Sequence, residues 1–156
     1  MTPNTPYAKI VILGHTGFIG SWVMRKLQEL GGGIEVLGYS TSAVDLTRWE
    51  QGQTLAGNFN RQTAVIMCAG IKKQVEESLD AFHQNMAMTH NLARLLRKSP
   101  VNRFVYFSSG SVYGENLDHL EINEQTPVNP VSYYGIAKYA SEGIFNKVSE
   151  EDGEMS

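Results

Sequence analysis

The sequence lacks several features that would assign a protein to a special class. It has a single cysteine, Cys68, so no disulfide can form within the chain. No apolar run approaches the roughly 20 residues of a membrane-spanning helix, and the N-terminal segment has neither the basic region nor the apolar core of a signal peptide. We therefore expect a cytoplasmic protein that does not insert into membranes.

Excess charge is also missing. The net charge is −3, and no basic stripe is present, so the sequence gives no indication of a nucleic-acid partner. The histidines do not follow the spacing of metal ligands, and we expect no metal site; they are His15, His83, His90 and His119.

What the chain does contain is an alternation of apolar strands with amphipathic helices, in 156 residues that suffice for one domain. The expected strands cover 9–14, 34–40, 63–70 and the first part of 102–114. The expected helices cover 18–30, about 75–98 and about 132–149, with one short helix within 44–57. The pattern predicts a Rossmann-type, doubly wound α/β fold, in which a parallel sheet has helices on both faces and ligands bind at the carboxyl ends of the strands.

The first expected strand leads directly into "GHTGFIG", residues 14–20. Gly14, Gly17 and Gly20 allow a tight turn and a close approach of backbone to a pyrophosphate, and the following helix N-terminus offers N–H groups to phosphates. Its place between a strand and a helix makes this a dinucleotide-binding loop rather than a turn of packing glycines.

A second segment, "VSYYGIAKYASEG" (131–143), holds two tyrosines and one lysine on an expected helix. Tyr134 lies four residues before Lys138 and shares its helix face, whereas Tyr133 does not. An ammonium beside a phenol is expected to lower the pKa of the phenol, which favours proton transfer. Such pairs also occur by chance on surface helices, so the pair alone is weak evidence.

Several motifs in order resemble the extended short-chain dehydrogenases/reductases, the NAD(P)-dependent epimerase/dehydratase group. They are "GHTGFIG", "VDLT", "CAGIKK", "QNMAMTHNLARLL", "FVYFSSGSVYG" and "NEQTPVNPVSYYGIAK". The resemblance implies that a nicotinamide cofactor is bound by Gly14, Thr16, Gly17, Phe18, Ile19, Gly20, Ser40, Asp45, Leu46, Cys68, Ala69, Gly70, Lys72, Asn85 and Lys138. For Cys68 a small buried apolar side chain, and for Asn85 an ordinary polar helix residue, are the alternatives.

The same resemblance implies a catalytic set of Ser109, Tyr134 and Lys138. Tyr134 would transfer a proton to or from the substrate oxygen, Ser109 would donate a hydrogen bond to that oxygen, and Lys138 would stabilise the phenolate and bond the cofactor ribose. The implied activity is an epimerase, dehydratase or reductase, with a nucleotide sugar as the expected substrate. A binding module without turnover and a reductase of non-sugar carbonyls remain the alternatives.

The sequence departs from the family pattern in two places. The second expected strand ends "LGYSTS", without the acid that binds the ribose hydroxyls of NAD, so NAD and NADP both stay open with a slight preference for NADP. The chain is also about half as long as the family's members. We expect an NAD(P)-binding domain over 1–148, a disordered polar tail over 149–156, and no C-terminal substrate-binding region. The resemblance further implies a homodimer formed through the two long helices.

Overall fold

The computed structural model describes residues 7–114 and 121–156. Within them, the strands form one parallel sheet in the order β2-β1-β3-β4. The strands are β1 (Lys9–Leu13), β2 (Glu35–Tyr39), β3 (Thr63–Met67) and β4 (Arg103–Tyr106). Leu13 is in register with Tyr39 and Met67, and Met67 with Tyr106, so all four strands end at one edge of the sheet. The doubly wound α/β prediction is confirmed, and this edge is where such folds bind ligands.

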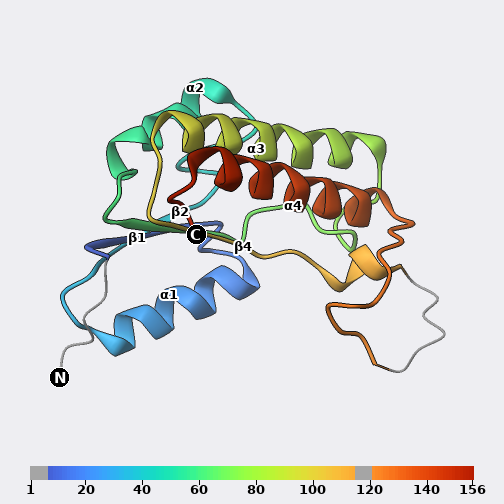
Figure 1. Ribbon diagram of the computed structural model, residues 1–156, viewed down its shortest axis with the longest axis horizontal. Coiled ribbons are helices and arrows are strands. Elements are labelled where there is room, and N and C mark those ends of the chain that lie inside the picture. The colour runs from blue at the N-terminus through green and yellow to red at the C-terminus, as the bar shows by residue number, and fades with distance from the viewer. Residues whose placement is uncertain (1–6, 115–120) are drawn as a thin grey trace.

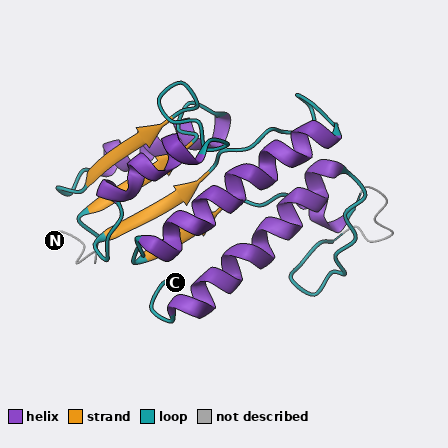
Figure 2. Ribbon diagram, turned by 90° about the horizontal axis from the view of Figure 1, so that it is seen from above, coloured by secondary structure: helices purple, strands orange, loops and turns teal. Residues whose placement is uncertain are grey.

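Helices cover both faces of the sheet, but unequally (Figure 1). Helix α1 (Phe18–Leu30) lies alone on one face and packs against β1 and β2. The other face carries α2 (Trp49–Gly52), α3 (Leu79–Lys98) and α4 (Tyr133–Asp152). Figure 2 shows α3 and α4 running side by side. Short 3-10 helices span Gln53–Asn58 and Gly110–Tyr113.

The hydrophobic core is larger on the face of the sheet that α3 and α4 cover. There Val11 and Val65 are fully buried in one large cluster with residues of both helices. On the α1 face the buried cluster is small and consists of Ile10, Ile12 and Ala64. Val105 of β4 pairs with Ile66, which belongs to that face, and is 39% exposed. The sheet is therefore covered on both sides over β1 and β2 but not over β4.

The C-terminal segment is ordered, contrary to the disordered tail expected for 149–156. Helix α4 continues to Asp152, and Met155 is buried against the main core. The Ser156 N–H donates to the Asn102 carbonyl at 3.2 Å, and the Phe104 N–H donates to the Ser156 carbonyl at 3.0 Å, which is a parallel strand pairing on the edge of β4. An acidic, polar composition favoured disorder, but tertiary contacts decide the outcome here.

Some element boundaries differ from those expected. Helix α3 begins at Leu79 rather than near residue 75, because the Ser78 hydroxyl caps it by accepting the Ala81 N–H at 3.0 Å. Strand β3 ends at Met67, so the segment 68–70 lies beyond the strand, at the ligand-binding edge. Within the described ranges, no helix is long and apolar enough to cross a membrane.

Candidate functional site

The glycine loop between β1 and α1 is shaped by close backbone contacts. A Cβ on Gly20 would lie 2.3 Å from the Gly14 carbonyl oxygen, and Gly14 itself has a φ of +86° that L side chains rarely adopt. A Cβ on Gly14 would lie 2.8 Å from the Ala69 nitrogen. No side chain caps the start of α1 at Gly17, so its first N–H groups are available to an anion. The loop therefore fits the pyrophosphate of a dinucleotide.

A large hollow opens in front of this loop, between the ends of the strands and α4. Of the predicted residues, it is lined by Gly14, Thr16, Gly17, Phe18, Ile19, Gly20, Ser40, Cys68, Ala69, Gly70, Lys72, Tyr134 and Lys138. Ile71, Met88, Phe107 and Ser108 line it too, and sequence reasoning did not single them out. All four fall inside the quoted motifs, so motif position could have found them.

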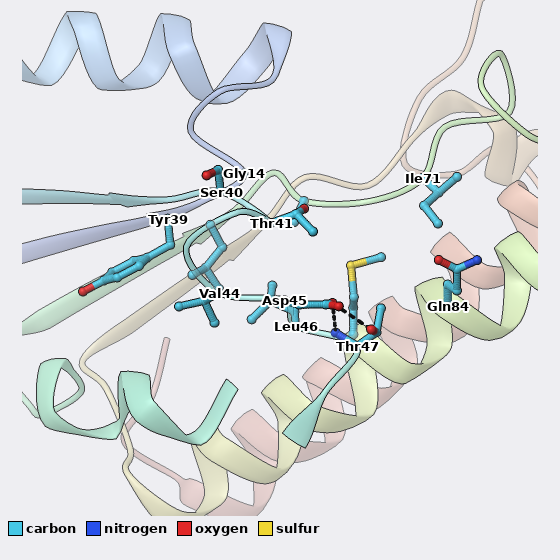
Figure 3. Close-up of a pocket in the computed structure, with 13 residues that line it drawn as sticks. Gly14, Tyr39, Ser40, Thr41, Val44, Asp45, Leu46, Thr47, Ile71 and Gln84 are labelled. Carbon is cyan, nitrogen blue, oxygen red and sulfur yellow. Dashed lines mark hydrogen bonds between the residues drawn. The ribbon is translucent and has the colours of Figure 1, made fainter. Parts of the chain in front are cut away.

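A second, smaller hollow adjoins the first at the end of β2 (Figure 3). Asp45 and Leu46, two of the residues expected to bind the cofactor, line it. One carboxylate oxygen of Asp45 is already engaged, because it accepts the Thr47 N–H at 2.9 Å and the Thr47 hydroxyl at 2.7 Å. The Leu46 carbonyl accepts the Asn91 amide at 2.9 Å. These bonds fix the wall of the hollow and leave the other Asp45 oxygen for a ligand.

The end of β2 carries hydroxyl groups in place of an acid. Ser40 lines both hollows, and its hydroxyl is 2.8 Å from that of Ser42. The segment 39–42 holds no Asp or Glu that would repel a 2′-phosphate. The geometry therefore places neutral hydrogen-bonding groups where an NAD site usually has a carboxylate.

Asn85 lies behind the site and lines neither hollow. Its side-chain oxygen accepts the Ile71 N–H at 2.8 Å, and its amide donates to the Ile71 carbonyl at 3.0 Å. Asn85 is thus bonded to both main-chain groups of one residue in the loop that contains Gly70 and Lys72. These bonds hold the loop that forms the wall of the site, and the expected cofactor contact of Asn85 stays a prediction.

The three candidate catalytic residues converge at the carboxyl end of β4. Tyr134 and Lys138 line the large hollow, and Ser109 lies close enough to Tyr134 to lower the pKa of its phenol. The Lys138 Nζ lies 5.7 Å from the centroid of the Tyr134 ring. Tyr133 points elsewhere: its ring packs against Phe82 at a centroid distance of 6.3 Å. The structure thus brings together the residues chosen by Y-x-x-x-K spacing.

Burial dominates the ionisation of this group. It lowers the pKa of Lys138 to about 8, with partial compensation from the negative charge of neighbouring groups. Burial also raises the pKa of Tyr134, and the hydrogen bond from Ser109 opposes that rise. The lowered phenol pKa expected from sequence is therefore not found. The Lys138 ammonium donates to the Phe107 carbonyl at 2.8 Å, and desolvation of the phenol is the larger effect.

Cys68 is neither fully buried nor freely exposed. It follows β3, lines the large hollow, and is half-buried; this burial raises the pKa of its thiol, while Lys138 acts in the opposite direction. The described residues contain no group of three or more His, Cys, Asp or Glu side chains that could hold a metal ion. His119 lies outside the described residues.

A parallel sheet with a glycine loop after its first strand, facing a hollow at its ligand-binding edge, defines a dinucleotide-binding scaffold. The model of the NAD dependent epimerase/dehydratase family matches residues 10–155, and the chain belongs to this family.

Known relatives are consistent with this assignment. A putative UDP-glucose 4-epimerase of Methanocaldococcus jannaschii is 29% identical over 85% of this chain and 48% of its own length. The solved UDP-glucose 4-epimerase of Thermotoga maritima, with UDP-glucose, is 27% identical with a TM-score of 0.78 over 93% of this chain and 52% of that one. The Thermus thermophilus enzyme with NAD is 25% identical with a TM-score of 0.80 over the same shares, 93% and 52%. The chain spans about half the length of the curated relatives that it matches.

Proposed function

We propose that this chain is the cofactor-binding and proton-transferring part of an NAD(P)-dependent epimerase, dehydratase or reductase acting on a nucleotide sugar. One observation carries the proposal: Tyr134 and Lys138 line the same hollow that the glycine loop faces, and Ser109 lies beside Tyr134, where it lowers the pKa of the phenol. A phosphate-binding loop and a proton-transfer group share one space there, which is the arrangement that hydride transfer to or from a bound substrate requires.

Each side chain has a defined task in this proposal. Burial keeps the Tyr134 phenol protonated at neutral pH, the form that donates a proton to a substrate carbonyl; in the opposite direction the phenolate accepts one from a hydroxyl. Ser109 donates a hydrogen bond to the same substrate oxygen. In this proposal the Lys138 ammonium bonds ribose hydroxyls and stabilises the phenolate. The nicotinamide, when bound, supplies or accepts the hydride.

The cofactor choice extends this proposal. Because segment 39–42 offers hydroxyls and no acid, we expect the adenosine end to accept a 2′-phosphate, and the site to favour NADP slightly over NAD. The solved relative with NAD shows that the family's scaffold also takes the unphosphorylated form. Fluorescence titration of the purified chain with NADH and NADPH measures the preference directly. At least tenfold tighter binding of NADH would contradict the preference for NADP.

The decisive test of the catalytic assignment is Tyr134→Phe, with Tyr133→Phe as the matched control one position away. We expect Tyr134→Phe to reduce turnover of a nucleotide sugar by about 100-fold or more, with NADH affinity within threefold of wild type, and Tyr133→Phe to retain activity. Activity of Tyr134→Phe within a few-fold of wild type would contradict the mechanism.

A second candidate is a dinucleotide-binding module without turnover, because the glycine loop and the hollow in front of it account for cofactor binding without any substrate. Calorimetry separates the two. Binding of NADH together with UDP-glucose supports the enzyme, whereas binding of NADH without any nucleotide sugar supports the module. A reductase of non-sugar carbonyls would instead show turnover in a carbonyl screen without affinity for nucleotide sugars.

We also propose a homodimer in which α3 and α4 pack against the same helices of a second copy. A shallow groove runs between the outer sides of these helices, and its lining includes Ala93 and Ile144 flanked by charged side chains such as Arg94 and Lys147. Sedimentation at micromolar concentration tests this assembly. A monomer at all concentrations up to 100 µM, a value on the order of the weakest physiologically relevant dimers, would contradict it.

A further inference from the structure

A carboxylate that the proposed mechanism does not use lies one helical turn beyond the candidate catalytic lysine. Glu142 follows Lys138 by four residues and Tyr134 by eight, so all three lie on the face of α4 that meets the end of β4. Its Oε1 accepts a hydrogen bond from the Ser108 hydroxyl. Ser108 lines the large hollow and also a groove beside β4 that Glu142 lines. Glu142 thus contacts the wall of the site from behind.

The Ser108–Glu142 bond is one of two hydrogen bonds that join the segment Phe107–Ser109 to α4. In the other, the Phe107 carbonyl accepts from the Lys138 Nζ at 2.8 Å. The next residue, Ser109, lies close enough to Tyr134 to lower the pKa of its phenol. The segment is therefore held to α4 by bonds from two consecutive residues, and its third residue lies beside the candidate catalytic tyrosine.

The Glu142 charge also acts on the Lys138 ammonium. Burial lowers the pKa of Lys138, and the Glu142 carboxylate opposes that effect, as the Cys68 sulfur would if it were ionised. The titratable groups that face this ammonium are Cys68 after β3, Tyr106 on β4, and Tyr134 and Glu142 on α4. From α3 its neighbour is the neutral amide of Asn85. The Cys68 thiol is itself held protonated by burial, which leaves Glu142 as the carboxylate that favours the ammonium.

We propose that Glu142 is a positioning residue, whose carboxylate holds the segment Phe107–Ser109 against α4 and so fixes Ser109 and Lys138 relative to Tyr134. The inference rests on the proposed function, because the positions of these groups have a use only if they act on a bound cofactor and substrate. It adds to that function a group that touches neither of them.

The test uses NMR of the 156-residue chain labelled with 13C at the Cε of lysine, which needs neither cofactor nor turnover. Lys138→Arg assigns the Lys138 signal. Glu142→Gln removes the charge and keeps the shape, and Ser108→Ala removes the hydrogen bond and keeps the charge. Glu150→Gln is the control, since Glu150 lies on the same helix, is exposed, and pairs with Lys147 at 3.1 Å.

We expect the Lys138 signal to titrate near pH 8 in wild type and lower by roughly half a unit or more in Glu142→Gln. Glu150→Gln should leave it unchanged. Ser108→Ala should keep the Lys138 midpoint close to that of wild type but accelerate exchange of the Ser111 amide, which donates to the Ser109 hydroxyl, by about threefold or more.

Two results would overturn the proposal: an unchanged Lys138 midpoint in a folded Glu142→Gln variant, or unchanged Ser111 exchange in Ser108→Ala. If Glu142→Gln does not fold, the exchange measurement on Ser108→Ala decides. NADH titration of wild type judges the proposed function separately. A wild-type chain that binds no NADH refutes that function, while the two NMR results still decide whether Glu142 holds this segment in place.

Discussion

The buried ammonium of Lys138 gives the sharpest test of the site's electrostatics. Lys138 is 6% exposed, and burial lowers its pKa from 10.5 to about 8. The charged form is therefore less favourable in the folded chain than in the unfolded chain, by about 3 kcal/mol at neutral pH. Lys138→Met removes this cost but leaves the Phe107 carbonyl without its donor, which costs about 1–2 kcal/mol. We expect the variant to gain roughly 1–2 kcal/mol in free energy of unfolding at pH 7.

Urea unfolding at several pH values separates the effect of the Lys138 charge from that of the lost hydrogen bond to the Phe107 carbonyl, because only the charge depends on pH. Between about pH 8 and 10.5 the unfolded wild type binds more protons at Lys138 than the folded form does, so its stability rises with pH relative to the variant. The advantage of methionine should shrink over this range and disappear by about pH 10. Lys147→Met, on the exposed side of α4, should show no such trend. If the free energies of unfolding of wild type and Lys138→Met differ by the same amount from pH 7 to 10, burial does not lower the pKa of Lys138 and the reasoning is refuted.

Three further predictions concern the loop, a helix start and the tail. Gly20→Ala places a Cβ 2.3 Å from a backbone oxygen, so we expect a loss of about 1–3 kcal/mol in urea unfolding and weaker NADH binding. Gly143→Ala meets nothing within 4 Å on the same kind of element and should gain about 0.5–1 kcal/mol. Ser78→Ala removes the cap of α3 and should cost about 1 kcal/mol, again by urea unfolding. The hydrogen bond from Arg61 lowers the pKa of the Asp152 carboxyl, so Asp152→Asn should lower the urea midpoint at neutral pH, with wild type losing its advantage as pH falls below about 4.

Each of these predictions has a clear contradicting result. Equal urea midpoints for the two alanine variants would show that the loop accommodates a Cβ. An unchanged midpoint for Ser78→Ala would show that the cap contributes nothing measurable. A gap between wild type and Asp152→Asn that persists at pH 2 would show that the carboxyl acts through something other than its charge.

Local patterns were sufficient for much of the fold and part of the site. The glycine loop lies between a strand and a helix within seven residues, 14–20, so its shape is determined by nearby backbone. Spacing along one helix was enough to choose Tyr134 over Tyr133, because the face on which a residue lies depends only on its position along the helix. The strands of a parallel sheet end at one edge, which brought these distant motifs together.

Features that depend on distant partners could not be predicted in this way. The Ser108–Glu142 bond joins residues 34 apart, and the Arg61–Asp152 pair joins residues 91 apart. The Ser108–Glu142 bond places a glutamate behind the site that the motifs did not indicate. The Arg61–Asp152 pair holds the end of α4 in a segment whose composition indicated disorder. The pKa of Tyr134 depends on how deeply the phenol is buried, which no spacing along the helix reveals.

Burying the ionisable groups at the end of β4 lowers the stability of the folded chain. Burial raises the pKa of Tyr106 to about 12 and that of Tyr134, and it lowers the pKa of Lys138 to about 8. A domain selected for stability alone would place an apolar side chain at position 138, because a buried ammonium is unfavourable. Retaining a lysine there, bonded to a carbonyl and facing a phenol, indicates that its charge is used. If Lys138→Met has a higher free energy of unfolding but binds NADH weakly, the lysine destabilises the fold because cofactor binding requires its charge.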